Sequence, residues 1–412
     1  MWIISASLNA ATERSLGRIG LQRVFSQANR PDAGGRLAVN AGGGLLHDSA
    51  TRKITMSEDK LLPLRQKIDA IDAQILDLLN QRARVAQEVG HVKAETNAPV
   101  FRPEREAQVL RKAAERNPGP LLGADIQTIF REVMSACRAL EKRVAVAYLG
   151  PQGTFSEQAV YQQFGHAVEG LSCVSIDEVF RDAEAGTADF GVVPIENSSE
   201  GVINRTLDLL LQTTLRISGE ISIPVHHSLM TCGGNMQGIT RICAHSQALA
   251  QCNAWLNQNY PGIERQAVAS NAEAARMASE DTTVAAIAGE IAGQKYNLQT
   301  VNAHIQDDPH NRTRFAVIGR LQTAPSGRDQ TSIVLSVPNK AGAVYNLLAP
   351  LAQHGVSMTR FESRPARMGA WEYYFYVDLE GHELDEKVAK ALAELKANAA
   401  FFKLLGSYPF TA

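Results

Sequence analysis

The sequence "LLPLRQKIDAIDAQILDLLNQRARVAQEVGHVKA" (residues 61–94) decides the fold of the first patterned part of the chain. Its apolar residues recur at steps of three and four, the spacing of one face of an amphipathic helix. This seam consists of Leu64, Ile68, Ile71, Ile75, Leu78, Val85, Val89 and Val92. We therefore predict one helix over residues 61–93, with its seam packed as in a helical bundle.

Arg82 stands where the next apolar residue of the seam should be. A cation on a packed face is costly unless it is paired. Lys93 follows eleven residues later, close to three full turns, so it shares that face. Arg105 and Glu106 add charge at the start of a second predicted helix, where Pro103 suits the first turn. These charges predict a pocket for a multiply anionic ligand, with solvated charges on an exposed face as the alternative.

A third helix is predicted over residues 125–141, which completes an all-helical domain over residues 56–142. Its apolar face holds Ile126, Phe130, Val133, Cys137 and Leu140. Arg65 precedes Arg82 by seventeen residues, about 26 Å along the first helix, so only a second subunit could bring it to the same pocket. Solvated charge on an exposed face would also explain Arg65.

The hydrophobic period changes after residue 143. Strands predicted over residues 144–149, 189–195, 241–245 and 283–287 alternate with helices over 180–185 and 206–211, which indicates an α/β domain over residues 143–321. "QTAPSGRDQ" (322–330) is a polar linker with Pro and Gly. Residues 331–412 follow the order βαββαβ, the ferredoxin-like plan.

The composition excludes several classes of protein. The 412 residues carry a net charge of −2, so no basic field for nucleic acid or anionic membranes is expected. No apolar run approaches the roughly 18 residues of a membrane span. Five cysteines without a CxxC pair favour a reducing, cytoplasmic location. The histidines, including His226 and His227, form no HExxH motif, so we expect no metal and interpret them as loop or core residues.

The first 55 residues contain six Arg and one Lys against three acids and show no sustained period. This composition is compatible with an organelle transit peptide. The alternatives are a disordered extension or sequence upstream of a true start at Met56, because patterned sequence begins directly after that residue. We predict a disordered extension over residues 1–55 that neither fold nor activity requires.

The segment 61–94 and "RPEREAQVL" (102–110) closely resemble the all-helical chorismate mutase family, over residues 61–141. The resemblance implies a rearrangement of chorismate to prephenate without nucleophile or cofactor. It implies that the carboxylates and ether oxygen of the substrate are bound by Arg82, Lys93 and, from a second subunit, Arg65. Arg105 and Glu106 would line the site, Glu106 holding the substrate hydroxyl, while Glu141 would face the ether oxygen. Arg102 and Cys137 depart from the family pattern, which leaves their roles open.

Four loops of the α/β domain follow or precede predicted strands: "YLGPQGTFSEQA" (148–159), "PIENSSEGVIN" (194–204), "AHSQALAQC" (244–252) and "NRTRFAVIG" (311–319). Each alone could be a plain turn, and no GxGxxG of a dinucleotide-binding dehydrogenase occurs. Together they resemble the prephenate dehydratases, over residues 144–320. The resemblance implies a two-lobed fold like that of periplasmic binding proteins, with the active site in the cleft. It implies catalysis by Thr313, prephenate binding by Thr154, Ser156, Asn197 and Ser198, and a carboxylate held by Arg314. The role of His245 stays open, because Ala244 and Ser246 depart from the pattern.

The C-terminal segments "NKAGAVYNLL" (339–348) and "TRFESRPAR" (359–367) resemble the ACT domains of phenylalanine-regulated dehydratases. The resemblance implies phenylalanine at a dimer interface, surrounded by Gly342, Ala343, Val344, Glu362, Ser363 and Arg364. The whole chain then reads as a bifunctional enzyme of phenylalanine biosynthesis with feedback inhibition, a homodimer through its helical and ACT domains. The rival is an amino-acid sensor or binding protein whose catalytic residues have decayed, and the intact Arg82, Lys93, Glu106, Asn197 and Thr313 favour the enzyme.

Overall fold

The computed structural model describes residues 47–96, 98–337, 340–365 and 373–410, with side chains from residue 61 onward. The chain divides into two compact units, Met1–Ile71 and Asp72–Ala412. Residues 1–46, which include most of the predicted extension, lie outside the described part. The predicted fold class is confirmed: a helical segment, a two-lobed α/β domain and a ferredoxin-like domain follow one another along the chain.

Helix α1 (His47–Thr96) is longer than the sequence predicted. Residues 47–55, which we expected in a disordered extension, are helical, because neither Pro nor Gly interrupts the chain between His47 and Pro63. The predicted apolar seam is exposed along α1, with Ile75, Leu78 and Val85 retaining 49%, 62% and 58% of their accessible surface. One chain alone therefore leaves this seam uncovered along the described part of α1.

Helices α2 (Pro103–Glu115) and α3 (Gly123–Ala139) pack against each other. Pro103 occupies the first turn of α2, as predicted. On α3 the buried residues are Met134, Ser135, Cys137 and Arg138, whereas Phe130 and Leu140 of the predicted face are exposed. The buried face of α3 thus includes Arg138, a charged residue that the spacing of apolar residues had not indicated.

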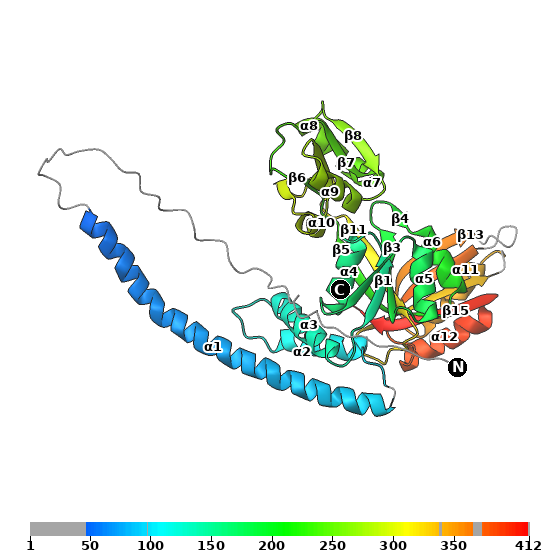
Figure 1. Cartoon of the computed structure of the whole chain (residues 1–412). Helices are drawn as coiled ribbons and strands as arrows, with labels where there is room; N and C mark the ends of the chain where they lie inside the picture. The colour runs from blue at the N-terminus through cyan, green and yellow to red at the C-terminus, as the bar shows by residue number, and fades with distance from the viewer. Residues whose placement is uncertain (1–46, 97, 338–339, 366–372, 411–412) are drawn as a thin grey trace, which may run out of the picture. The chain divides into compact units, whose positions relative to one another are not determined.

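Two mixed sheets build the α/β domain (Figure 1). The first has the order β2-β1-β3-β11-β5, with β4 beside β3, and the second has the order β10-β6-β9-β7-β8. The strands of the first sheet are β1 (Ala145–Leu149), β2 (Glu169–Cys173), β3 (Phe190–Asn197), β4 (Gly201–Val202), β5 (Arg216–Pro224) and β11 (Arg312–Gly319). Those of the second are β6 (Ser228–Thr231), β7 (Arg241–His245), β8 (Glu264–Val268), β9 (Val284–Ala288) and β10 (Gln299–Asn302).

The chain crosses between the two sheets twice. It leaves the first sheet after β5 and returns to it with β11, so residues 225–227 and 303–311 connect the lobes. The helices of this domain are α4 (Phe155–Phe164), α5 (Ile176–Ala185), α6 (Asn204–Gln212), α7 (Ser246–Gln251), α8 (Asn253–Asn259), α9 (Asn271–Glu280) and α10 (Glu290–Lys295). A two-lobed domain with a double crossing is the arrangement that places a ligand cleft between the lobes.

The C-terminal domain forms an antiparallel sheet of order β13-β14-β12-β15. Its elements are β12 (Asp329–Val337), α11 (Ala343–Gln353), β13 (Met358–Pro365), β14 (Tyr373–Glu380), α12 (Glu386–Asn398) and β15 (Phe401–Pro409). Val334, Tyr376, Leu405 and Tyr408 of this sheet join one apolar cluster with Ile217 of β5. A Cβ on Gly406 would overlap the Ile217 carbonyl, so β15 lies directly against β5.

Candidate active sites

A cavity of about 950 Å³ lies between α1, α2 and α3 in the second compact unit. The structure brings the predicted Arg82, Lys93, Arg105, Glu106 and Glu141 together around it. Arg102 and Cys137, whose roles the sequence left open, line it too. Arg65 is exposed on the part of α1 that belongs to the first unit, and its predicted role in a second subunit stays a prediction.

The charges around this cavity are matched to an anionic ligand. Five cations and three carboxylates line it, which leaves an excess of two positive charges. The cations are Arg82, Lys93, Arg102, Arg105 and Arg138, and the carboxylates are Glu104, Glu106 and Glu141. A dianion would therefore neutralise the cavity.

Glu141 is held against α1 at the end of the cavity. The Nζ of Lys93 lies 3.3 Å from its Oε2 and also donates to the carbonyl of Val100 at 3.2 Å. The Glu141 side chain keeps only 9% of its surface exposed. It fits because position 90 is glycine: a Cβ there would lie 2.6 Å from Glu141 Cγ. The missing side chain of Gly90 thus makes room for the Glu141 carboxyl.

Glu106 is paired with Arg138, a residue that sequence reasoning missed. Burial raises the pKa of Glu106 above its ordinary value, and the Arg138 guanidinium opposes that rise. Arg138 bonds to the Glu106 carboxylate, donates to the carbonyl of Phe164 and lies over the Phe101 ring, 5.0 Å from its centroid. The available signal was the one that marked Arg82: a cation four residues after the apolar Met134, and therefore on the same face of the helix.

A second cavity, of about 820 Å³, lies between the two lobes of the α/β domain. The first lobe contributes Thr154, Ser156, Asn197 and Thr313 to its lining, all of them predicted site residues. The second lobe contributes Gln247, Gln251 and Asn271 among others. Ser198 and Arg314, also predicted, are not among the lining residues.

Thr313 and Asn197 are opposite each other on the paired strands β11 and β3. The Nδ2 of Asn197 donates to Thr313 Oγ1 at 2.9 Å, and its Oδ1 accepts from the backbone N–H groups of Ser199 and Glu200 at 3.0 and 3.1 Å. Since backbone N–H groups can only donate, the orientation of the Asn197 amide is fixed. Thr313 therefore accepts from Asn197, and its own proton is directed elsewhere.

Thr154 and Ser156 stand at the start of α4. Thr154 caps the helix: its Oγ1 donates to the carbonyl of Leu149 at 3.1 Å and accepts from the N–H of Glu157 at 3.4 Å. Ser156 is 6% exposed. Both residues edge the cleft through a helix N-terminus, a place where anionic groups are stabilised.

The same segments of the chain match three families. Residues 64–142 match chorismate mutase type II, residues 146–323 match prephenate dehydratase and residues 331–397 match the ACT domain. The bifunctional chorismate mutase/prephenate dehydratase of Neisseria gonorrhoeae is 49% identical over 355 residues, which cover 85% of this chain and 98% of that protein. The enzyme of the same name from Pseudomonas aeruginosa is 45% identical over 358 residues, with the same two coverages. The chain belongs to the family of bifunctional chorismate mutase/prephenate dehydratases.

The solved structure of a prephenate dehydratase from Arthrobacter aurescens in complex with L-Phe is also similar to the chain. It is 34% identical, with a TM-score of 0.60, and the match covers 65% of this chain and 90% of that one. The helical cavity therefore lies in the mutase domain of this bifunctional family, and the cleft lies in its dehydratase domain.

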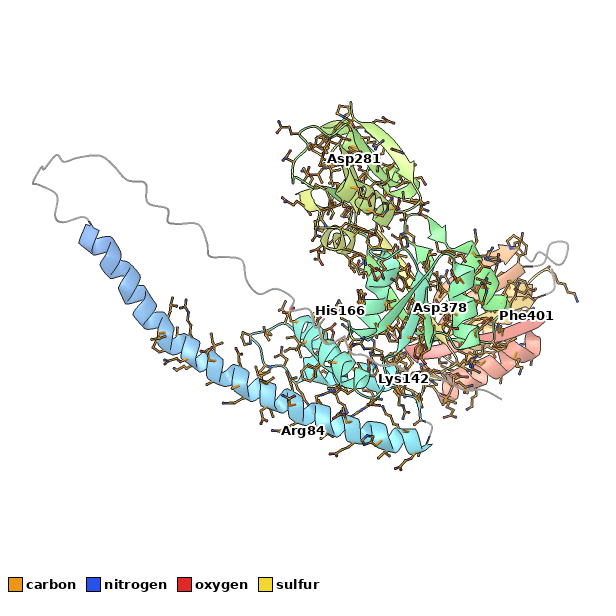
Figure 2. The ribbon with its side chains drawn as sticks, viewed as in Figure 1. Arg84, Lys142, His166, Asp281, Asp378 and Phe401 are labelled. Carbon is orange, nitrogen blue, oxygen red and sulfur yellow. The ribbon has the colours of Figure 1, made fainter. Side chains whose placement is uncertain are left out.

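Arg314 of the dehydratase domain does not lie where the sequence led us to expect it. Its guanidinium contacts Glu220 at 2.7 Å, Glu196 at 3.0 Å and, in the ACT domain, Asp378 at 3.1 Å (Asp378 is labelled in Figure 2). Burial would lower the pKa of Arg314, but the hydrogen bonds to Glu220 and the charge of Asp378 raise it above its ordinary value. Three carboxylates surround Arg314 and it does not line the cleft. Its role in holding a carboxylate of prephenate stays a prediction.

The predicted phenylalanine-binding residues occupy two places in the ACT domain. Gly342 is the N-cap of α11 with φ of 75°, a left-handed conformation that favours glycine, and Ala343 and Val344 begin the helix. Glu362, Ser363 and Arg364 lie on β13. Arg364 is paired with Asp208 of α6 at 2.8 Å, so this group touches the dehydratase domain. Their role in binding phenylalanine stays a prediction.

Two further findings bear on expected absences. Across the residues that the structure describes, no helix is both long enough and apolar enough to cross a membrane. Within that part of the chain, His, Cys, Asp and Glu side chains form no group of three that could hold a metal ion.

His245, whose role was open, caps the short helix α7: its Nδ1 accepts from the N–H of Gln247 at 3.4 Å.

Proposed function

We propose that the two cavities catalyse successive reactions, with prephenate made in the mutase cavity and consumed in the dehydratase cleft. The observation that carries this proposal is that one chain holds both sites with their predicted polar residues in place, Arg82, Lys93 and Glu106 in one and Asn197 and Thr313 in the other. Chorismate would become prephenate, and prephenate would become phenylpyruvate, carbon dioxide and water.

The mutase cavity suits an intramolecular rearrangement. The substrate must be held in its reactive conformer while charge separates across the breaking ether bond. The excess of two positive charges around the cavity matches the two carboxylates of chorismate. Arg82 and Lys93 supply donors for the ether oxygen, and one such preorganised donor is worth about 3–4 kcal/mol. Glu106, buried and paired with Arg138, supplies an acceptor for the substrate hydroxyl.

The dehydratase cleft suits a coupled loss of carboxylate and hydroxyl. As the ring carboxylate leaves as carbon dioxide, its electron pair completes the aromatic ring and the ring hydroxyl departs. Thr313 is a weak acid, so aromatisation supplies most of the driving force and the residue supplies a positioned proton. Because Asn197 donates to Thr313, the threonine proton is free for the departing hydroxyl, and water in the cleft restores it.

Incubating the pure chain with chorismate and measuring phenylpyruvate tests both roles at once. Arg82→Ala should abolish mutase activity and spare the turnover of supplied prephenate, whereas Thr313→Ala should do the reverse. If either substitution silenced both reactions in a folded chain, the assignment of two sites would be wrong. A decayed sensor protein, the rival interpretation, would turn over neither substrate.

A second copy of the chain is the expected cover for the apolar seam of α1. Side chains such as Ile68, Ile75 and Val92 are 56%, 49% and 62% exposed, and a continuous stripe of this kind seldom faces water in a soluble protein. A homodimer through this seam, with the ACT domains as a further contact, would also let Arg65 of the second copy reach the mutase cavity. Ile75→Glu should therefore shift the sedimentation coefficient toward that of the monomer and lower mutase activity. If both stayed at wild-type values, the seam would not be a dimer interface.

Feedback inhibition by phenylalanine fits the ACT domain. A prephenate dehydratase relative was solved in complex with L-Phe. In this chain the N-terminus of α11, which has no side-chain cap, offers backbone N–H groups to a carboxylate. The pair of Arg314 with Asp378 joins the ACT domain to the strand that carries Thr313. Phenylalanine should inhibit the dehydratase more than the mutase, and equal inhibition of both would argue against this route.

A further inference from the structure

The amide of Asn197 starts a chain of hydrogen bonds whose direction the backbone fixes. Because the Asn197 Oδ1 accepts from two backbone N–H groups, its Nδ2 must donate, and it does so to Thr313 and to Asn311 Oδ1, the latter at 3.0 Å. Ser198 Oγ accepts from the N–H of Arg312 at 2.9 Å, so its own proton can go to Asn311 Oδ1 at 3.3 Å. Asn311 therefore presents its amide oxygen to this side and its Nδ2 to the other.

The chain of donors continues into the second lobe through Gln251. The Nδ2 of Asn311 donates to Gln251 Oε1 at 3.1 Å. The same oxygen lies 3.0 Å from the Nε2 of His227. Since a carbonyl oxygen only accepts, His227 must carry its proton on Nε2. The tautomer of this histidine is thus set by a series of contacts that begins at the backbone beside Asn197.

The other ring nitrogen of His227, Nδ1, is a hydrogen-bond acceptor that receives no hydrogen bond from the described residues. His227 is 2% exposed, and burial lowers its pKa below the ordinary value, so the ring is neutral near pH 7. With the proton on Nε2, the Nδ1 atom holds a lone pair. Among the described residues no group donates to Nδ1, although the atom is buried. A buried polar atom without a partner is costly and calls for a specific explanation.

His227 and Thr313 line the same cleft, and the substrate carries one matching group. At neutral pH the two carboxylates and the keto group of prephenate only accept hydrogen bonds, and its ring hydroxyl is its single donor. We propose that Nδ1 of His227 accepts the hydrogen bond of this ring hydroxyl and turns the oxygen lone pairs toward Thr313. No bond to the histidine forms or breaks, and the hydroxyl leaves as water after taking the proton from Thr313.

This inference rests on the proposed role of Thr313 and adds a substrate contact to it. A purely structural role for His227 is the competing explanation, because the residue lies on the segment that connects β5 to β6. There its N–H donates to Gln306 Oε1 at 3.0 Å and its carbonyl accepts from Ile305 at 2.8 Å. The two explanations differ in one respect: only a contact with the ring hydroxyl distinguishes prephenate from a ligand that lacks that group.

Two substitutions separate the ring nitrogens of His227. Gln places an amide near Nε2 and removes the acceptor at Nδ1, whereas Asn keeps an oxygen near Nδ1 and loses the donor to Gln251. We expect His227→Gln in the full chain to lower kcat/KM for prephenate about 10- to 100-fold, the effect of losing one buried hydrogen bond. His227→Asn should lose less. Inhibition by phenylpyruvate, the product without the hydroxyl, should stay within about twofold of wild type in both.

His226→Gln is the matched control, because this neighbouring histidine bonds to Gln306 at 3.0 Å and lies outside the cleft lining. Mutase activity of the same chain reports whether each variant is folded. Wild-type turnover of prephenate in His227→Gln would overturn the proposal. So would an equal loss of affinity for prephenate and phenylpyruvate, or a larger loss in His227→Asn than in His227→Gln. Thr313→Ala, assayed in parallel, tests the threonine separately: its full activity would refute the proposed proton donor whatever the histidine variants show.

Discussion

A single methyl group at position 90 should lower mutase activity at least tenfold without unfolding the chain. Gly90 lies in α1, where a Cβ would come within 2.6 Å of Glu141 Cγ, 3.0 Å of its Cδ and 3.3 Å of its Cβ. Carbon atoms at rest lie about 3.5–4.0 Å apart, so the Glu141 side chain must retreat by roughly 1 Å. The carboxyl would then leave its place beside Lys93 at the edge of the cavity.

The expected loss of activity is large and the expected loss of stability is small. A displacement of about 1 Å in a catalytic constellation can lower the rate about 100-fold. Alanine favours a helix over glycine by about 0.8–1.0 kcal/mol, which offsets part of the strain and keeps α1 helical. We expect Gly90→Ala to lower mutase kcat/KM at least tenfold while the turnover of supplied prephenate and the melting temperature stay close to wild type.

The controls decide whether the effect runs through Glu141. In Gly123→Ala the new methyl would meet Ala114 Cβ at 3.4 Å, an ordinary contact, so this variant of the same domain should keep its mutase activity. Adding Glu141→Ala to Gly90→Ala should cost little beyond Glu141→Ala alone, because both remove the same carboxyl. Wild-type mutase activity in Gly90→Ala, or full additivity in the double variant, would refute the reasoning.

Three further outcomes follow from named contacts. Glu106 must be ionised to accept a hydrogen bond from the substrate hydroxyl, so mutase activity should fall as the pH drops through the pKa of Glu106. Burial raises this pKa, and the Arg138 guanidinium opposes the rise. Arg138→Met should therefore move the acid limb of the pH profile to higher pH. Gly342→Val puts a branched side chain at a φ of 75° and should abolish phenylalanine inhibition in dehydratase assays while uninhibited turnover persists. Asp378→Asn removes one charge beside Arg314 and should weaken that inhibition severalfold, measured as the concentration of phenylalanine for half-inhibition.

The periodic spacing of apolar residues predicted helices and strands well where one face of the element is buried. The strand predicted over residues 241–245 coincides with β7, whose middle residues are fully buried. The start of α1 was missed, because residues 47–55 are helical without an apolar period to mark them. Propensity and the absence of Pro or Gly were the only signals there, and these are weak guides in isolation.

The relation of the ACT domain to the rest of the chain could not be predicted. The sequence indicated only a polar linker over residues 322–330, whereas Val334, Tyr376 and Leu405 are buried in the same cluster as residues of the first dehydratase sheet. Their alternation in the sequence is that of residues in the core of a sheet. The alternation does not specify against which part of the protein each face of that sheet packs. Deleting the ACT domain would therefore expose apolar surface of the dehydratase, which makes point substitutions the cleaner test of regulation.

The different surroundings of Thr313 and Arg314 show why site residues are harder to predict than strands. Successive side chains on a strand point to opposite faces, so neighbours in sequence can serve different sites. On β11, Thr313 lines the cleft, whereas Arg314 bonds to Glu220 and to Asp378 of the ACT domain. The two residues are adjacent in the family motif, but their side chains lie on opposite faces of the strand. That separation brings the charge contact of the ACT domain within one residue of the proposed proton donor, which gives a bound effector a short physical route to the dehydratase site.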